Sequence, residues 1–433
     1  MNRLINSGDN VTEQTTHHIR VGWLIDGSGG PIQKNQVITV ESGRITAVSP
    51  EADTDPDAGR ITDLSRCVVL PPLIDSHIHL CMSGSIDPEL RKRQLEFGYE
   101  DLVPVMAEHL RHLFSHGVLA IRDGGDRLGS VLRYLRDEHD RSDNPVIVQS
   151  PGIAYHRKDR YGGLIAEAVA QQVSLLEAWQ RRKEQPGLIK IVNSGLNSLT
   201  RYGHETKPQF SESEMRELVR AAKRSGASVM VHANGTVPVG TALRAGCDSI
   251  EHGFFMGREN LDRMAGTGTF WVPTAYTMKT FAENADSYRT VIDRDVVAKT
   301  LENQLQQLAY ARERGVRVAM GTDSGSIGVL HGESMVEEMK LYMKAGYSLS
   351  EAICCATEGA AQLLGLPDFG SIRVGKPARF LVTKGMPSQL PRKLSYLEAI
   401  FIDGRPSPLY RRDPDYTTLR KYDGVAFGGK VRY

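Results

Sequence analysis

The chain of 433 residues has few cysteines and no excess of charge of either sign. The five cysteines, at positions 67, 81, 247, 354 and 355, form no C-x-x-C pair, which argues against a disulfide framework and against a cysteine-rich zinc site. The 53 basic and 52 acidic side chains leave a formal net charge of +1. This balance gives no electrostatic reason to expect binding to nucleic acid or to a membrane surface.

Membrane and export signals are also missing. The first twenty residues contain no apolar segment typical of a signal peptide, and no uninterrupted apolar run approaches the length of a membrane span. We therefore expect a soluble, cytoplasmic protein with no nucleic-acid or membrane partner. With 40% hydrophobic residues, a chain of this length can bury a large core.

The residue pattern divides the chain into three stretches. The first, over residues 20–64, contains short strand-like segments joined by tight turns, and similar segments return after residue 366. Between them, apolar runs alternate with helical patterns, which is typical of βα units around a parallel sheet. We place the boundaries at residues 1–66, 67–366 and 367–433. The two terminal parts are expected to form one small β-sandwich-like domain.

The central stretch contains eight strand-like runs. They are "CVVLPPLIDSHIHL", "GVLAIRDGG", "PVIVQSPG", "GLIKIVNSG", "ASVMVHANG", "CDSIEHG", "TFWVPTA" and "VRVAMGTDSG". This number of strands in a stretch of this length predicts an α/β fold, a (β/α)8 barrel of the TIM type. Before the fifth run, Ser211 and Glu214 are spaced as a capping box at a helix start, and Gly226 can end that helix.

Polar residues suited to metal binding or catalysis stand in or just after most of these runs. They are His77 and His79 in the first, Lys190 in the fourth, His232 in the fifth, His252 in the sixth and Asp323 in the eighth. In a barrel the carboxyl ends of the strands converge on one face, where active sites lie. A single histidine at a strand end is more often a hydrogen-bonded structural residue, but six such residues in register predict a metal-dependent hydrolase.

At this point the sequence resembles the amidohydrolase superfamily. The resemblance is carried by "LPPLIDSHIHL", "IRDGG", "LIKIVNSG", "VHANG", "IEHG", "GTDSG", "ATEGAAQLLGL" and "GSIRVGKPA", in this order along nearly the whole chain. Within the superfamily it is most similar to the imidazolonepropionase-related branch, which includes Xaa-Pro and Xaa-Arg dipeptidases with a carboxylated lysine. The resemblance implies a barrel with a flanking β domain and one or two divalent ions.

The resemblance also implies a role for each of the six residues. His77 and His79 would hold the first metal with Asp323, and His232 and His252 would hold the second. Lys190 would bridge the two metals as a carbamate formed with carbon dioxide, because a plain ammonium would repel two dications. Four imidazoles favour zinc, although nitrogen and oxygen ligands also admit manganese, iron or cobalt. We expect two ions and a homo-oligomer.

The expected reaction is hydrolysis of an amide C–N bond, in a dipeptide or a small N-acyl or aryl amide. A divalent ion makes hydroxide available near neutral pH, and Asp323 is then placed to act as general acid and base. The alternatives are a cyclic-amide hydrolase like imidazolonepropionase, a deaminase, or a non-catalytic binding protein. A deaminase normally has an acid soon after the fifth-strand histidine, and "VHANGTVP" has none. A non-catalytic protein on the same barrel would be expected to have lost some of the ligands, and all six are present.

The residues that contact the substrate are less clearly marked. Tyr155 and His156, after the third run, and His331, after the eighth, are candidates, although a solvated loop is an equally good interpretation of the segment 155–163. Asn234 stands where dipeptidase relatives often have a second histidine, and Leu196 stands where a second glycine is common. These two departures leave the substrate open.

Overall fold

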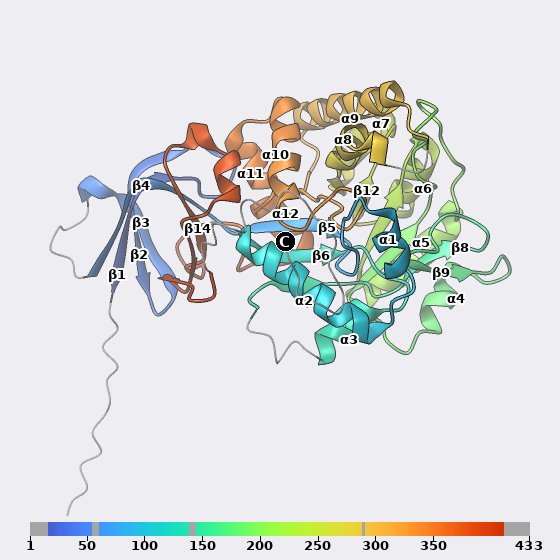
Figure 1. Cartoon of the computed structure of the whole chain (residues 1–433), viewed down its shortest axis with the longest axis horizontal. Coiled ribbons are helices and arrows are strands. Elements are labelled where there is room, and N and C mark those ends of the chain that lie inside the picture. The colour runs from blue at the N-terminus through green and yellow to red at the C-terminus, as the bar shows by residue number, and fades with distance from the viewer. Residues whose placement is uncertain (1–15, 54–59, 138–143, 288–290, 411–433) are drawn as a thin grey trace, which may run out of the picture.

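The structure is a computed structural model that describes residues 16–53, 60–137, 144–287 and 291–410. A mixed sheet lies at one side of the molecule, and a helix-covered region built on parallel strands makes up the rest (Figure 1). The first fifteen residues and the last twenty-three of the proposed terminal domain, 1–15 and 411–433, lie outside the described residues.

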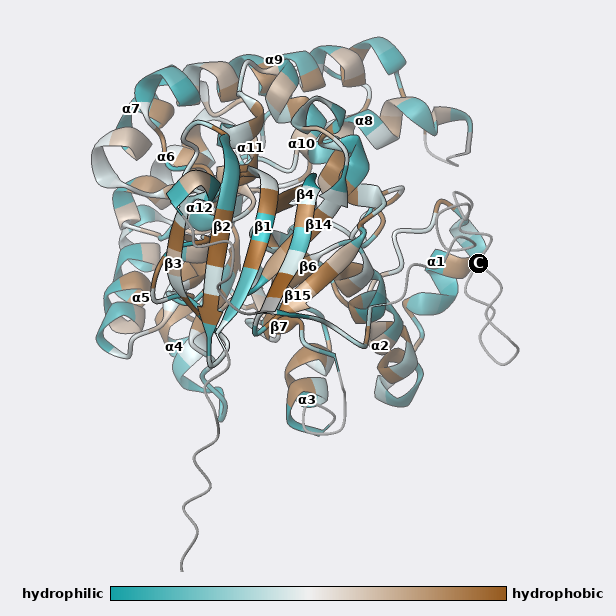
Figure 2. Ribbon diagram, turned by 90° about the vertical axis from the view of Figure 1, so that its left-hand side faces the viewer, coloured by the Kyte–Doolittle hydropathy of each residue, from teal (hydrophilic) through white to brown (hydrophobic). Residues whose placement is uncertain are grey.

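The mixed sheet joins segments from the two ends of the chain. Its seven strands run in the order β16-β15-β14-β4-β1-β2-β3. Their bounds are β1 His17–Leu24, β2 Gln33–Glu41, β3 Arg44–Pro50, β4 Arg60–Leu70, β14 Phe380–Lys384, β15 Ala399–Ile402 and β16 Arg405–Pro406. Hydrophobic and polar residues mix along these strands (Figure 2), and a separate core contains stacked rings of Phe380 and Phe401, 4.7 Å between centroids. The sheet therefore buries a core of its own.

The first apolar run of the central stretch forms two strands instead of one. β4 ends at Leu70 in the mixed sheet, and β5, Leu73–Ile78, begins a parallel sheet. Pro71 and Pro72 separate them, because a proline has no N–H to donate to a strand ladder. β4 also crosses residue 67, where the sequence placed a domain boundary.

The parallel strands form two sheets, in the orders β5-β6-β7 and β13-β12-β11-β10-β8-β9. Their bounds are β6 Val118–Asp123, β7 Ile147–Gln149, β8 Ala154–Arg157, β9 Ala166–Val169, β10 Leu188–Val192, β11 Ser228–Ala233, β12 Ser249–His252 and β13 Phe270–Val272. β5, β6, β10 and β12 are buried along their whole length, as expected for strands covered on both faces. The register pairs Val192 with His232 and Ala233 with His252, so these strand ends lie side by side.

Two predicted runs differ in detail. The third continues beyond β7 into β8, where Tyr155 pairs with Ile191 of β10. Of the two alternatives for the segment around Tyr155, the solvated loop does not describe Tyr155 itself, because its ring is buried and its backbone is extended. The eighth run makes single parallel bridges, Val318 to Trp271 of β13 and Ser324 to Ile78 of β5.

Helices pack around the parallel strands (Figure 1). They are α1 Pro88–Gln94, α2 Tyr99–Ser115, α3 Ser130–Asp137, α4 Leu175–Gln180, α5 Glu212–Arg224, α6 Thr236–Ala245, α7 Gly257–Thr267, α8 Tyr276–Glu283, α9 Arg294–Arg314, α10 Ser334–Lys344, α11 Leu349–Cys355 and α12 Glu358–Leu364. Within the described ranges, no helix is both long enough and apolar enough to span a bilayer.

The helix predicted before the fifth run is α5. Ser211 caps it by accepting a hydrogen bond from Glu214 N, and Gly226 follows its end with φ of 77°. The Glu214 carboxylate does not complete the predicted capping box. It accepts from Arg157 Nη2 at 2.5 Å and from Leu175 N at 3.1 Å, because a buried guanidinium is the stronger partner.

Candidate metal centre

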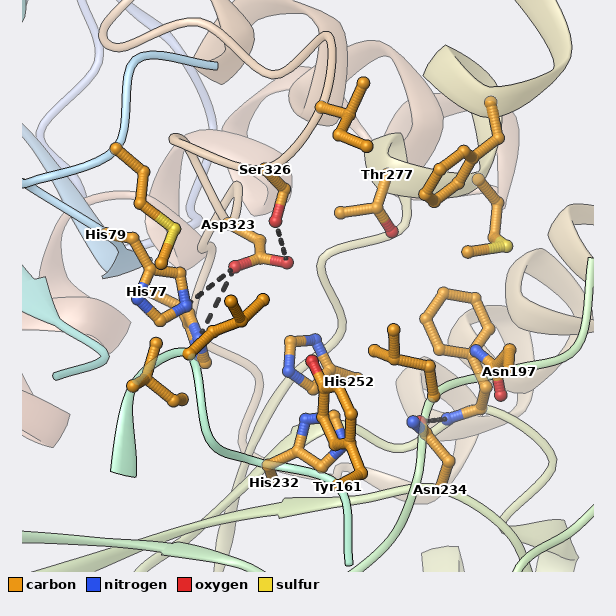
Figure 3. Close-up of a pocket in the computed structure, with 18 of the residues that line it drawn as sticks. His77, His79, Tyr161, Asn197, His232, Asn234, His252, Thr277, Asp323 and Ser326 are labelled. Atoms are coloured by element: carbon orange, nitrogen blue, oxygen red, sulfur yellow. Dashed lines mark hydrogen bonds and ion pairs between the residues drawn. The ribbon is translucent and has the colours of Figure 1, made fainter. Parts of the chain in front are cut away.

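One cavity brings together all six residues that the sequence singled out. It has a volume of about 220 Å³ and opens at the carboxyl ends of the parallel strands. Its lining includes His77, His79, Lys190, His232, His252 and Asp323. We call His77, His79 and Asp323 the trio and His232 and His252 the pair; Figure 3 shows the two groups side by side.

The trio converges on one point. One ligand atom from each residue lies within 4.8 Å of the others. Asp323 Oδ1 is 3.4 Å from His79 Nε2 and 3.7 Å from His77 Nε2. Two ligand atoms that each lie about 2.1 Å from a tetrahedral zinc ion stand about 3.4 Å apart. These spacings are thus longer than a good hydrogen bond and suit a shared ion.

The outer nitrogens of the trio histidines donate to fixed acceptors. His77 Nδ1 donates to Glu251 Oε2 at 2.6 Å, and His79 Nδ1 donates to the carbonyl of Gly125 at 3.1 Å. In a neutral imidazole the other nitrogen then carries a lone pair, which here faces Asp323. This is the arrangement in which outer partners orient histidines toward a metal.

Each histidine of the pair also contacts a partner through one ring nitrogen, but both partners are uncharged. His252 Nδ1 lies 2.7 Å from Thr274 Oγ1, and His232 Nε2 donates to the carbonyl of Gly195 at 3.3 Å. The two ring centroids are 4.6 Å apart, and that of His252 is 4.9 Å from that of His77. Among the described residues, the other nitrogen of each ring of the pair has no hydrogen-bond partner.

Burial favours the neutral form of three of the histidines. It lowers the pKa of His77 to about 4, that of His252 to about 3, and that of His232 well below its usual value. Although burial opposes it, Asp323 raises the pKa of His79 above its ordinary value. Neutral imidazole is the form that binds metal ions.

The donor set fits a divalent cation. Asp323 Oδ1 is buried and has no hydrogen-bond partner within the described part of the chain. The other carboxylate oxygen of Asp323, Oδ2, accepts a hydrogen bond from Ser326 Oγ at 2.8 Å. A buried carboxylate oxygen that faces imidazole lone pairs is unfavourable unless a positive charge lies between them. A metal ion held by His77, His79 and Asp323 would supply that charge.

Lys190 is buried in the middle of the site. Only 1% of it is exposed, and its Nζ lies 3.5 Å from His77 Nε2. Within the described ranges, no carboxylate oxygen lies within 4.0 Å of this nitrogen, although buried lysines are ordinarily paired. Burial lowers the pKa of Lys190 to about 8, so the neutral amine is far more populated near neutral pH than in an exposed lysine.

Backbone strain collects at the same place. His252, Thr274 and Asp323 have positive φ values of 68°, 46° and 61°. Such conformations cost about 1–3 kcal/mol each and tend to occur at functional sites. Gly124 lies against the trio, and a Cβ on it would come within 2.6 Å of His79 Cε1. The glycine of "IRDGG" thus leaves room for the histidine rings.

Glu251 is the main residue that the sequence interpretation missed. It is fully buried, and its carboxylate joins His77 to Arg122, whose Nη2 donates to Oε1 at 2.8 Å. Although burial alone would raise it, Arg122 and His77 lower the pKa of Glu251 below its usual range. An acid inside the buried strand "SIEH" was the available signal, because such an acid must be paired.

Arg122 and Asp123 do not pair with each other, and each positions a neighbouring group. Asp123 accepts from Leu80 N at 3.0 Å and from Gly125 N at 2.9 Å, which fixes the backbone next to His79 and the backbone of the glycine that His79 contacts.

Tyr161 is a second residue that the sequence interpretation missed. Its ring lies 5.6 Å from that of His232 and lines the cavity (Figure 3).

The three substrate candidates lie away from the cavity lining. The Tyr155 ring is in the core with the Arg182 guanidinium 3.9 Å from its centroid, and His156 Nδ1 donates to Arg160 O at 3.1 Å. His331 lies behind the trio, where its Nε2 donates to His79 O at 3.2 Å. Each of the three side chains thus contacts another part of the protein and does not line the cavity.

The sequence model described as the amidohydrolase family matches residues 68–431. The chain belongs to this family. The match confirms the expected resemblance and the expectation of a metal-dependent hydrolase that acts on carbon–nitrogen bonds. The fold relatives of the family imply a TIM-type barrel architecture for the parallel strands.

Two enzymes and a solved dipeptidase structure are among the proteins that are similar over most of the chain. Imidazolonepropionase of Paracoccus denitrificans is 26% identical over 414 residues, which cover 85% of this chain and 93% of the relative. Ochratoxinase of Aspergillus niger is 26% identical over 401 residues, covering 85% and 81%. The crystal structure of a Xaa-Pro dipeptidase with methionine bound in its active site has a TM-score of 0.74 and 26% identity, covering 91% of this chain and 100% of that one.

Proposed function

We propose that this amidohydrolase cleaves an amide bond of a small molecule, a dipeptide or an N-acyl or aryl amide, with two divalent ions, zinc by preference. The trio holds one ion and the pair holds the other. The observation that carries the proposal is that each of the four histidines contacts a partner through one ring nitrogen, and that all four line one cavity with Asp323. The dipeptidase and amide-hydrolysing relatives support the substrate class.

Lys190 is proposed to be carboxylated. The pair supplies only two imidazoles, whereas a zinc site needs at least three protein ligands. Reaction of the neutral amine of Lys190 with carbon dioxide forms an N–C bond and releases one proton, which gives an anionic carbamate. This group would add the missing oxygen ligand and would remove a buried ammonium that has no carboxylate partner among the residues that the structure describes.

Asp323 is proposed as the general acid and base. Bound divalent ions lower the pKa of water and polarise a carbonyl oxygen. Asp323 then accepts the proton from the attacking water and returns it to the departing nitrogen. The hydroxyl of Ser326 donates to Oδ2 at 2.8 Å and orients the carboxylate. Asp323 is the only carboxylate in the cavity lining among the described residues, so it serves both steps.

We also propose that the parallel strands close into an eight-stranded barrel, with β7 and β8 sharing the third position and residues 316–320 forming the eighth. The bridges from Val318 to β13 and from Ser324 to β5 support this closure. The mixed sheet would then be the accessory domain, with the boundaries 1–66, 67–366 and 367–433.

A substrate panel tests the function. Protein stripped with a chelator and reloaded with zinc in bicarbonate buffer is assayed with dipeptides, N-acyl amines and anilides, and the products are identified. The expected result is metal-dependent release of a carboxylic acid and an amine. Release of ammonia from an amino-substituted ring would instead support a deaminase, and no turnover with a fully loaded protein would contradict the proposal.

A further inference from the structure

The cavity extends beyond the metal ligands into an apolar side chamber. We define the chamber by Leu196 and Leu199, which follow β10, by Phe254, which follows β12, and by Met278 and Phe281 of α8. Phe254 and Met278 belong to one hydrophobic cluster, with Leu199 and Phe281 packed against it. Thr277 and Asn197, which also line the cavity, lie away from the trio in Figure 3.

The chamber contains no charged side chain. The charged residues that line the whole cavity, among those described, are Lys190 and Asp323 at the metal site and Arg91. Arg91 lies on the side of the trio, because its Nη1 donates to the carbonyls of Ser85, at 3.4 Å, and Gly325, at 3.2 Å. A carboxylate placed in the chamber would therefore lose its hydration without gaining a cation.

The polar groups next to the chamber do not favour an anion either. Asn234 has both ends of its amide engaged, since Oδ1 accepts from Phe254 N at 3.1 Å and Nδ2 donates to Gly195 O at 3.4 Å. Thr277 Oγ1 donates to Thr274 O at 2.8 Å. Asn197 Oδ1 is a buried acceptor without a partner within the described residues, so it suits an N–H or O–H donor of an uncharged group.

We propose that the chamber binds an uncharged, bulky apolar group of the substrate, aromatic or branched aliphatic. The enzyme then prefers amides that present such a group over dipeptide-like compounds that would place a carboxylate there. The inference rests on the proposed amide hydrolysis and narrows its substrate class. Apolar lining with few polar groups is the usual character of a site for a neutral ligand.

Matched substrates test this preference on both sides of the amide. N-acetyl-2-phenylethylamine is compared with N-acetylphenylalanine, and the N-methylamide of 3-phenylpropionic acid with the mono-N-methylamide of benzylmalonic acid. In each pair the two compounds differ by one carboxylate. We expect at least a tenfold higher kcat/KM for the uncharged compound in the pair whose variable side occupies the chamber. Equal or higher values for both carboxylated compounds would overturn the inference.

Two phenylalanine variants locate the effect. Phe281→Ala enlarges the chamber, and Phe255→Ala is the matched control, because Phe255 packs on the same cluster but does not line the cavity. Phe281→Ala should lower kcat/KM for the preferred phenyl substrate about tenfold and change that for its methyl analogue less than twofold. Phe255→Ala should change neither. A similar loss with both substrates, or no loss, would count against the chamber.

A third variant changes the charge. Leu196 is 58% exposed, so Leu196→Arg is expected to fold. A cation at this position should move the preference toward the carboxylated compound by at least fivefold, while an unchanged ratio would contradict the assignment. Calorimetric titration with the same compounds separates this inference from the proposed function. Tighter binding of the uncharged compounds without turnover would refute amide hydrolysis alone, and tighter binding of the carboxylated ones would refute the chamber.

Discussion

The trio and the pair differ in what holds their histidines. His77 is anchored by the carboxylate of Glu251, which is itself held by Arg122, whereas the pair donates to or contacts a neutral hydroxyl and a backbone carbonyl. Hydrogen bonds to a charged group are about twice as strong as neutral ones. The trio also brings three candidate ligands close together, whereas the pair would need Lys190 to reach that number. We therefore expect the trio to bind its metal more tightly than the pair does.

The largest effect is expected from removing Lys190. In Lys190→Ala the pair loses its proposed third ligand, and turnover should fall on the order of 10³-fold, since a metal supplies several kcal/mol of transition-state stabilisation. The trio should keep its ion. Propionate should restore part of the activity by filling the space left by the side chain. Lys190→Met fills that space and serves as the control, so propionate should not rescue it; wild-type turnover in either variant would refute the bridging role.

Asp323→Asn should give the next largest effect. The amide keeps the shape of the side chain but cannot accept the proton, so kcat should fall by about 10²-fold or more while most of the metal stays bound. Steady-state kinetics and metal analysis of the same sample measure both quantities. Ser326→Ala, which removes only the hydrogen bond to Oδ2, should lower kcat less than tenfold. If Asp323→Asn loses metal and activity together, Asp323 is chiefly a ligand.

Glu251→Gln separates the anchoring of the trio from that of the pair. Loss of the buried charge leaves Arg122 unneutralised and should lower the free energy of unfolding by about 3–5 kcal/mol. It should also weaken metal binding at the trio by about 10–100-fold. Competition with a chromophoric chelator measures the affinity, and urea denaturation measures the stability. Unchanged affinity at the tighter site would show that Glu251 does not orient His77 for a metal.

Thr274→Val should give the smallest effect. In contrast to Glu251→Gln, it should weaken metal binding at the pair and not at the trio. Valine keeps the shape of threonine but removes the hydroxyl that contacts His252. Affinity at the weaker site should fall about tenfold, with the tighter site unchanged. A change at the tighter site would mean that His252 belongs with the trio.

The six strand-end residues were predictable because a parallel fold brings the carboxyl ends of its strands to one face, whatever the loops do. Glu251 was harder to find, since its partner Arg122 lies 129 positions away and only the sheet brings them together. Tyr155 and His331 show the opposite limit. Both follow strands, as predicted, but packing decides where a side chain points. Tyr155 packs into the core, and His331 contacts the backbone carbonyl of His79. The expected homo-oligomer stays a prediction.

Of the residues that form the apolar chamber, only Leu196 was noticed in the sequence, and the chamber itself could not be predicted. Phe254 and Met278 come from segments that look like any apolar loop and helix in the sequence, and only the tertiary structure places them beside Leu199. Asn234 was noticed as a departure from dipeptidase relatives, but its role as a link between Gly195 and Phe254 depends on two loops whose conformations sequence does not specify.

The number of metal ions per chain tests the central claim most directly. Wild-type protein is saturated with zinc, freed of excess metal and measured by elemental analysis beside the double variant His232→Ala/His252→Ala. A single His204→Ala variant serves as control, because His204 is exposed and outside the cavity. The account predicts two ions in the wild type and the control, and one in the double variant. One ion in all three proteins would contradict it.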